Sequence, residues 1–179
     1  MNKNKQERRS TKVQTEKEEP LFVEDTVYLS SKTTAEEVIK EISDKLLSEG
    51  LVKPAFYENV IGREKDYPTG IDLSVVDESL PNIAIPHTEG EFVNVRRVIP
   101  VHLEHPVTFK NIIDPSSSME VKFLFMILNN DPEGQSNILA QIMNFCTTTS
   151  PNDLGPFFKS TDTSAIYKFL KRSFEEQNM

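Results

Sequence analysis

Three side chains of this sequence have the chemistry to handle a phosphoryl group: His87, Arg63 and Thr69. Neutral imidazole is a good nucleophile near pH 7, and a guanidinium group matches phosphate oxygens in pairs. His87 follows an apolar run at residues 83–85 and then Pro86, which has no N–H and ends a strand ladder. His87 is therefore the first residue that no longer takes part in the predicted strand.

Arg63 and Thr69 belong to the stretch "GREKDYPTG", within 25 residues upstream of His87. If the strand after Thr69 lies beside the strand before His87, a cation and a hydroxyl gather around the imidazole. The alternative is a strand-end histidine that is satisfied by a backbone carbonyl and has no chemical role. The residues alone leave both interpretations open.

The other candidates for chemistry are weaker. His102 and His105 have a spacing that could hold a metal, but a zinc site needs three or four ligands and no second His or Cys cluster completes one. We expect His102 on a strand, at the surface or half-buried, and His105 exposed in a loop. Cys146 falls on the apolar side of a predicted helix, where a cysteine is usually inert. The count of zinc ligands argues against a metal, and because no glycine-rich phosphate loop occurs, no nucleotide cofactor is expected either.

Composition narrows the possible partners and location. A net charge of −8 over 179 residues disfavours binding to nucleic acid or anionic lipid and favours a partner with a basic patch. No apolar run approaches the roughly 20 residues of a membrane span, and no signal peptide is visible. The single cysteine agrees with a reducing compartment. We therefore expect a cytoplasmic protein that does not insert into a membrane.

The chain divides into a tail and one domain. Residues 1–20 are almost wholly polar and cannot bury enough apolar surface to offset the entropy of ordering, so they are predicted to be a disordered tail. A basic arm is the alternative for this segment. Residues 21–179 are predicted to form a single domain.

The domain begins with a short predicted strand at residues 27–29 and a helix with marked ends. Thr34 and Glu37 have the spacing of a capping box, and Gly50 stands where a C-terminal cap belongs. One apolar face is predicted for this helix: Val38, Ile39, Ile42, Leu46 and Leu47. A second helix is expected to begin at Pro54 and to end before Pro68, with Arg63 near its end.

Strands fill the middle of the sequence and helices its end. "TGIDL" and "NIAIP" predict short strands, and "RRVIPVHL", "VTFKNI" and "MEVKFLFMIL" predict two further strands with a hairpin. Residues 121–128 are apolar on both faces, as a central strand covered by helices should be. Helices are predicted after "NNDPEG" and at residues 164–175. This order predicts an α/β fold, a mixed sheet sandwiched between helices.

The segments "GREKDYPTGIDL", "IAIPHTE" and "VKFLFMILNNDPEGQSNIL" together resemble the fructose/mannitol-type enzyme IIA domain of the bacterial phosphoenolpyruvate-dependent sugar phosphotransferase system (PTS). The resemblance covers nearly all of the domain and implies the mannitol-type enzyme IIA fold. Within the family, "YPTGI", "NIAIPHTE" and "NNDPEGQ" are most similar to the galactitol-specific branch.

The resemblance implies that His87 accepts a phosphoryl group on Nε2 from the phosphohistidine of the carrier HPr. His87 would pass it to a cysteine of a IIB protein, and through IIB the domain would serve a membrane-embedded IIC. Arg63 corresponds to the arginine beside the active histidine, and Thr69 lies in the turn that supports it. Many members carry a second active-site histidine just before the helix that follows the central strand. This chain has none there, and Gln135 stands nearest to that place; its amide can donate a hydrogen bond but cannot become a cation.

Three functions remain open at this point. The first is a phosphoryl carrier for uptake of galactitol or a related sugar. The second is a regulatory IIA-like protein whose phosphorylation state controls its partners. The third is a binding or structural module in which His87 is inert.

Overall fold

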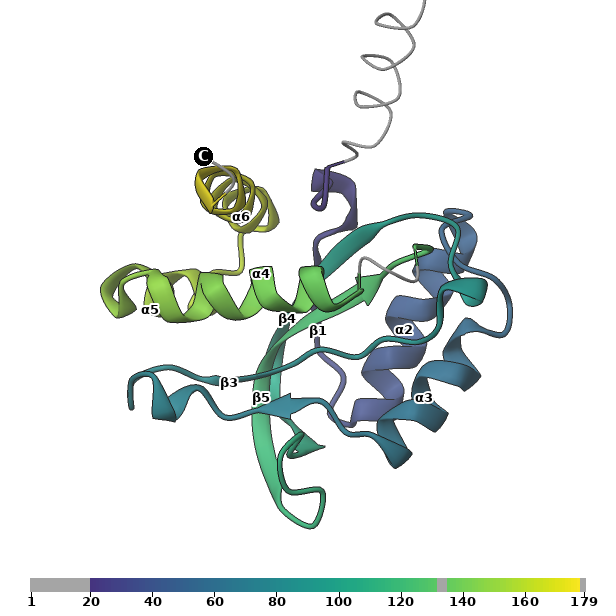
Figure 1. Ribbon diagram of the computed structural model, residues 1–179, viewed down its shortest axis with the longest axis horizontal. Helices are drawn as coiled ribbons and strands as arrows, with labels where there is room; N and C mark the ends of the chain where they lie inside the picture. The colour runs from purple at the N-terminus through teal and green to yellow at the C-terminus, as the bar shows by residue number, and fades with distance from the viewer. Residues whose placement is uncertain (1–19, 132–134, 178–179) are drawn as a thin grey trace, which may run out of the picture.

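The protein is described here by a computed structural model of residues 20–131 and 135–177. Within these residues, one mixed sheet has the strand order β1-β4-β5-β3-β2 (Figure 1). Its strands are β1 (Tyr28–Ser30), β2 (Gly70–Ile71), β3 (Asn82–Ala84), β4 (Arg97–Lys110) and β5 (Ser118–Leu128). β1 runs parallel to β4 and β3 parallel to β5, while β4–β5 and β2–β3 are antiparallel.

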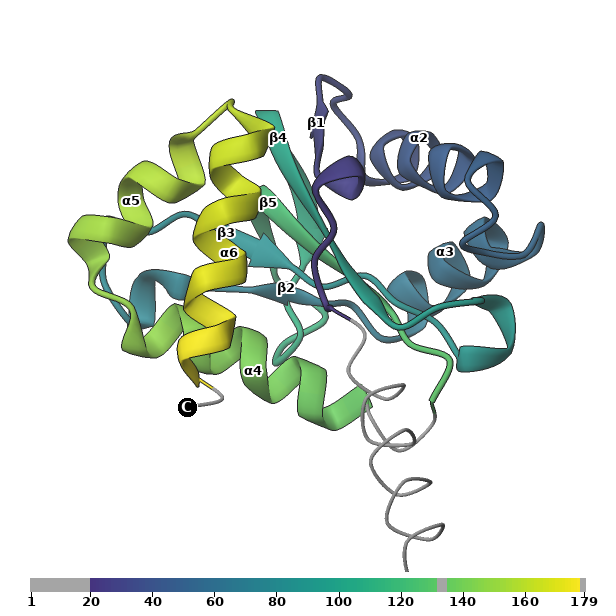
Figure 2. The same ribbon diagram turned by 90° about the horizontal axis from the view of Figure 1, so that it is seen from above.

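Helices cover both faces of this sheet (Figure 2). On one face lie α2 (Ala35–Ser48) and α3 (Phe56–Asp66), and on the other lie α4 (Gln135–Thr148), α5 (Pro151–Lys159) and α6 (Thr163–Gln177). The sheet order and the two helical layers confirm the predicted fold class. The tail predicted over residues 1–20 lies, except for its last residue, outside the described residues.

β5 is buried on both sides, as its sequence predicted. Phe123, Phe125 and Ile127 belong to the core under α4–α6, whereas Leu124 and Met126 belong to the core under α2 and α3. The alternation follows from the strand period of two. β5 therefore separates two hydrophobic cores and fixes the position of β3, which pairs with it.

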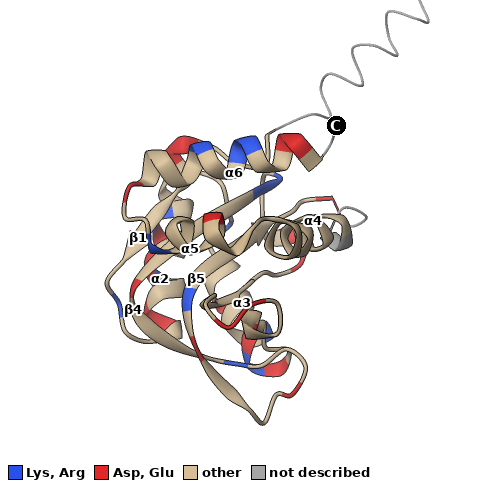
Figure 3. Ribbon diagram, turned by 90° about the vertical axis from the view of Figure 1, so that its left-hand side faces the viewer, with Lys and Arg blue, Asp and Glu red and all other residues tan. Residues whose placement is uncertain are grey.

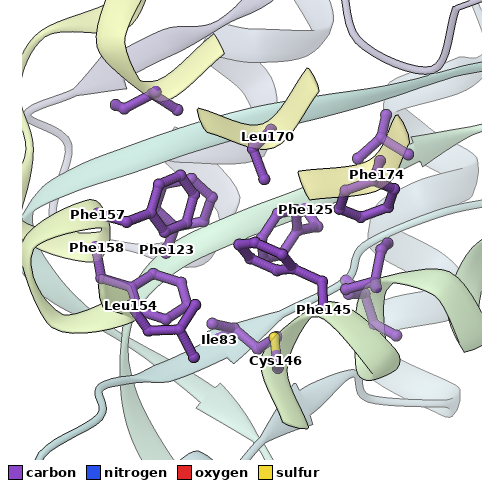
Figure 4. Packing of buried hydrophobic residues seen from close by; sticks show 14 of the residues in the cluster. Ile83, Phe123, Phe125, Phe145, Cys146, Leu154, Phe157, Phe158, Leu170 and Phe174 are labelled. Atoms are coloured by element: carbon purple, nitrogen blue, oxygen red, sulfur yellow. The ribbon is translucent and has the colours of Figure 1, made fainter. Parts of the chain in front are cut away.

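Phenylalanine rings fill the core under α4–α6 (Figure 4). Phe123 of β5 lies 5.2 Å from Phe157 of α5, and Phe145 of α4 lies 5.5 Å from the same ring, both measured between ring centroids. Tilted and edge-on contacts of this kind suit the quadrupoles of aromatic rings. Cys146 is fully buried beside them, in agreement with the inert role expected for it.

The ends of α2 confirm the predicted caps. Thr34 Oγ1 accepts a hydrogen bond from the Glu37 N–H, and Gly50 adopts a φ of +74° just beyond the helix. A positive φ is accessible to glycine at little cost, which is why helices often end there. The prediction that Leu47 lies on the buried apolar face is wrong. Its side chain is exposed, and Ser43 occupies part of the buried face instead.

Two predictions about the middle of the chain need correction. "RRVIPVHL" and "VTFKNI" form one long strand, β4, so His105 is not in a loop but at an exposed irregularity between His102 and Val107. Pro106 explains the irregularity, because it has no N–H for the ladder. His102 is buried rather than at the surface, and its Nδ1 lies 3.0 Å from the Phe158 carbonyl of α5.

Charge is distributed unevenly over the helices (Figure 3). α6 carries both signs of charge along its exposed side, whereas α4 has no charged residue. Among the described residues, no helix is long and apolar enough to cross a membrane.

Candidate functional site

β2 and β3 bring the predicted site residues together. Gly70 pairs with Ala84 and Ile71 with Ile83 in an antiparallel ladder, so the condition set by the sequence, that these two strands lie side by side, is met. Thr69 therefore stands opposite Ile85, two residues before His87. α3 ends just before this ladder, which brings Arg63 to the same edge of the sheet.

His87 stands where the chain leaves β3 and runs on beside β5. The Ile127 N–H donates to the Pro86 carbonyl, and His87 forms an isolated parallel bridge with Ile127. Pro86 is buried and its φ is restricted by its ring, so the segment that carries His87 has little freedom. The imidazole is consequently mounted on a rigid backbone at the edge of the sheet.

The ring orientation of His87 is fixed by one hydrogen bond. Its Nδ1 lies 2.7 Å from the Ile85 carbonyl oxygen. A carbonyl can only accept, so Nδ1 carries the proton and donates it, which leaves the lone pair of a neutral ring on Nε2. This is the tautomer in which Nε2 can act as a nucleophile.

The surroundings of His87 favour the neutral ring. Burial is the largest cause that lowers the pKa of His87, and the Arg63 guanidinium lowers it further. The hydrogen bond to Ile85 and the Glu89 carboxylate act in the opposite direction, but the pKa stays below the ordinary histidine value. The ring is therefore unprotonated at neutral pH.

Arg63 is paired with an acidic residue that sequence reasoning missed. Its Nη1 lies 2.7 Å from Glu89 Oε1, and Thr88 Oγ1 donates to Glu89 Oε2 at 2.8 Å. Hydrogen bonds from its own N–H and from the Thr88 hydroxyl lower the pKa of Glu89 most. The hydrogen bond and the positive charge of Arg63 lower it further. The guanidinium also lies over the Tyr67 ring, 5.7 Å from its centroid.

These side chains line an open pocket of about 520 Å³. Arg63, His87 and Glu89 form one side, and residues 129–131 after β5 form the other. The two sides pack closely: a Cβ on Gly90 would lie only 2.9 Å from the Asn129 carbonyl oxygen. The pocket is large enough to admit a phosphoryl group.

Thr69 is buried and reaches the imidazole through the backbone rather than directly. Its hydroxyl accepts a hydrogen bond from the Ile85 N–H and donates to the carboxylate of Glu64, a second residue that sequence reasoning missed. Both missed carboxylates stand in the quoted motifs, Glu64 in "GREKDYPTG" and Glu89 in "IAIPHTE". Gln135 begins α4, but its side chain lies outside the described residues.

No metal centre is formed by the described part of the chain, where no three His, Cys, Asp or Glu side chains converge suitably. Cys146 is no nucleophile in this environment either, because burial raises the pKa of its thiol to about 12. Of the candidate residues predicted from the sequence, His87 and Arg63 line the pocket, whereas Thr69 lies behind it.

The fold and the site define a mixed α/β domain that presents a neutral, oriented histidine beside an arginine in an open pocket. The sequence matches the family model "Phosphoenolpyruvate-dependent sugar phosphotransferase system, EIIA 2" over residues 20–173. The chain therefore belongs to this family of PTS enzyme IIA domains, for which the family name implies phosphoryl transfer.

Solved structures show the same fold. The chain is similar to the mannitol enzyme IIA of Escherichia coli, with a TM-score of 0.64 and 18% identity over 83% of this chain and 98% of that one. A complex of that IIA with phosphorylated mannitol enzyme IIB from the same organism matches with a TM-score of 0.63 and 20% identity over 84% of this chain and 96% of that one. Nitrogen regulatory protein IIA-Ntr of Neisseria meningitidis matches with a TM-score of 0.58 and 14% identity over 84% of this chain and 96% of that one. The search of curated protein sequences found no match to the chain.

Proposed function

We propose that this domain is a phosphoryl carrier in which His87 Nε2 accepts a phosphoryl group from the phosphohistidine of HPr and passes it to a cysteine of a IIB protein. The hydrogen bond from Nδ1 to the Ile85 carbonyl carries this proposal, because it directs the lone pair of a neutral ring to Nε2. The family match and the solved complex of a similar IIA domain with phosphorylated IIB support it.

In the forward step, the Nε2 lone pair attacks phosphorus while the P–N bond of the donor phosphohistidine breaks. The donor imidazole leaves with that electron pair and, with a proton on its other nitrogen, departs as a neutral ring. Nδ1 of His87 keeps its own proton, which it donates to the Ile85 carbonyl. In the second step a cysteine thiolate of IIB attacks phosphorus and the new P–N bond breaks. Such transfers depend on in-line positioning and on stabilisation of the charge on the phosphoryl oxygens, which we assign to Arg63. Gln135 is proposed as a hydrogen-bond donor to the same oxygens.

Several finer assignments belong to the same proposal. We place the domain in the cytoplasm and its IIB partner next to a membrane-embedded IIC. We propose galactitol or a related sugar as the transported substrate, on the resemblance of "YPTGI", "NIAIPHTE" and "NNDPEGQ" to the galactitol branch. The net charge of −8 favours a donor with a basic surface, so salt should slow the transfer from HPr.

The test is phosphate incorporation from phosphoenolpyruvate in the presence of enzyme I and HPr, followed by mass spectrometry. One acid-labile phosphate on His87 is expected, with none on a folded His87→Ala variant. His105→Ala is the matched control, since that side chain is exposed on β4, and it should incorporate phosphate normally. Incorporation into His87→Ala would refute the assignment.

A regulatory role is the second candidate, motivated by the fold shared with IIA-Ntr. The two roles differ in what happens to the phosphoryl group. Adding a galactitol-type IIB protein should discharge the phosphorylated domain onto the IIB cysteine if the domain serves transport. A phosphorylated domain that no IIB protein discharges would favour regulation.

A further inference from the structure

The Thr69 hydroxyl lies between two groups that it connects. On one side it donates to the Glu64 carboxylate, with Oγ1 at 2.8 Å from Oε2 and 3.1 Å from Oε1. On the other side it accepts from the Ile85 N–H at 3.2 Å. A hydroxyl has one proton and two lone pairs, so giving the proton to Glu64 leaves an acceptor directed at Ile85.

The backbone of Ile85 transmits this arrangement to His87. Ile85 lies one residue beyond the end of β3, and the Thr69 hydroxyl takes the place of a ladder partner for its N–H. Its carbonyl then holds Nδ1 of His87 at 2.7 Å. Any rotation of the Ile85 peptide groups would move the acceptor on which the ring orientation depends.

Glu64 fixes the far end of this series of hydrogen bonds. Besides the hydroxyl, its Oε1 accepts the Thr69 N–H at 2.9 Å, so the carboxylate holds Thr69 by both backbone and side chain. Burial raises the pKa of Glu64, whereas the two kinds of bond from Thr69 lower it. Burying a carboxyl group is unfavourable unless its oxygens are satisfied, and here Thr69 satisfies them.

Glu64 also follows Arg63 directly on α3. The two side chains point in different directions from one helical turn: Arg63 lines the pocket and pairs with Glu89, while Glu64 reaches the junction of β2 and β3. One helix thus places the cation beside the imidazole and orients the imidazole itself. A shift of α3 would disturb both together.

We propose that Glu64 is a positioning residue for phosphoryl acceptance, which acts through Thr69 and the Ile85 backbone to hold His87 in its Nδ1–H tautomer. The inference rests on the proposed function for its effect on rate, but not for its effect on the ring. Glu64 has no direct contact with the transferred group in this arrangement. Its contribution is to keep Nε2 in line with the donor, where a displacement of about 1 Å can lower a rate by about a hundredfold.

The experiment compares Glu64→Met, which removes the acceptor oxygens, with Glu64→Gln, which keeps one. Two readouts are needed: the ring ¹⁵N chemical shifts of His87 at a pH above its pKa, and the initial rate of phosphorylation by phospho-HPr. We expect Glu64→Met to mix the two tautomers and to lower the rate at least about tenfold. Glu64→Gln should retain the Nδ1–H tautomer and a rate within about threefold of the wild type.

Glu58→Met is the matched control, because Glu58 is an exposed carboxylate on the same helix. It should change neither readout. If Glu64→Met fails to fold, Thr69→Val and Thr69→Ser test the same link. Valine removes the hydroxyl and should mix the tautomers, whereas serine keeps it and should not.

The outcomes separate this inference from the proposed function. A wild-type tautomer in Glu64→Met or in Thr69→Val overturns the inference, even if phosphorylation slows. Mixed tautomers in these variants, with a wild-type protein that takes up no phosphate, support the positioning by Glu64 and refute the carrier function. Mixed tautomers in these variants, together with phosphate uptake that is slower than in the wild type but detectable, support both the positioning by Glu64 and the carrier function.

Discussion

At Gly70 a single added methyl group should displace the strand that supports the site. A Cβ built on Gly70 would lie 2.6 Å from the Lys110 carbonyl oxygen and 3.2 Å from Met119 Sδ, where ordinary contacts begin at 3.4 Å. The closer atom belongs to the backbone of β4 and cannot rotate away. Gly70 is also held on two sides, by its pairing with Ala84 and by the Ile112 N–H that donates to its carbonyl. Gly70→Ala must therefore displace β2.

Overpacking of this kind costs about 1–3 kcal/mol, and the backbone contact places Gly70→Ala near the upper end, at about 2–3 kcal/mol. With an m value of about 2 kcal/mol/M, the urea midpoint should fall by about 1 M or slightly more. Because the displacement carries Thr69 away from Ile85, the His87 ring should also lose its single tautomer.

Gly62→Ala is the control, because Gly62 lies inside α3 and a Cβ there meets nothing within 4 Å. Alanine should raise the free energy of unfolding by about 0.5–1 kcal/mol, since glycine in a helix interior has excess entropy to lose. Urea denaturation of both variants measures the contrast. Equal midpoints for Gly70→Ala and the wild type would refute the steric reasoning.

Three further predictions concern titratable groups. Cys146, whose thiol pKa burial raises to about 12, should react with thiol reagents only after unfolding, and rapid labelling of native protein would contradict its placement. In NMR titrations Arg63→Gln should raise the pKa of His87 and Glu89→Gln should lower it, so shifts of the same sign would be inconsistent with this charge arrangement. Burial lowers the pKa of His102 in the folded protein. As pH falls below about 6.5, the unfolded chain therefore binds a proton at this residue before the folded protein does, and the free energy of unfolding declines. His102→Gln should make that decline shallower when urea denaturation is repeated across this pH range.

The layered fold could be predicted from the sequence because its signals are local. The cap at Thr34, the glycine at Gly50 and the doubly apolar β5 each follow from residue type and period. The pairing of β2 with β3 was a conditional expectation, and the structure confirms it. These features suffice to bring Arg63, Thr69 and His87 to one edge of the sheet.

The partners of the site residues could not be predicted in the same way. Which atom a buried hydroxyl contacts depends on distances of a few tenths of an ångström between elements, and residue spacing does not encode them. The sequence therefore predicted the Thr69 hydroxyl near the imidazole, whereas it bonds to Glu64 and Ile85. His102 was misplaced for a related reason, since its burial comes from α5, which packs over β4 from 56 residues away.

The pairing of Arg63 with Glu89 bears on how a carrier can both accept and release a phosphoryl group. A guanidinium that faced only the phosphoryl oxygens would stabilise the phosphorylated state and slow its discharge. Arg63 lies 2.7 Å from Glu89, so under the proposed function Glu89 would keep Arg63 near the pocket before the group arrives and compete for it afterwards. Because a carrier works best when both transfers are close to balanced, a partly neutralised arginine suits the proposed function better than a free one.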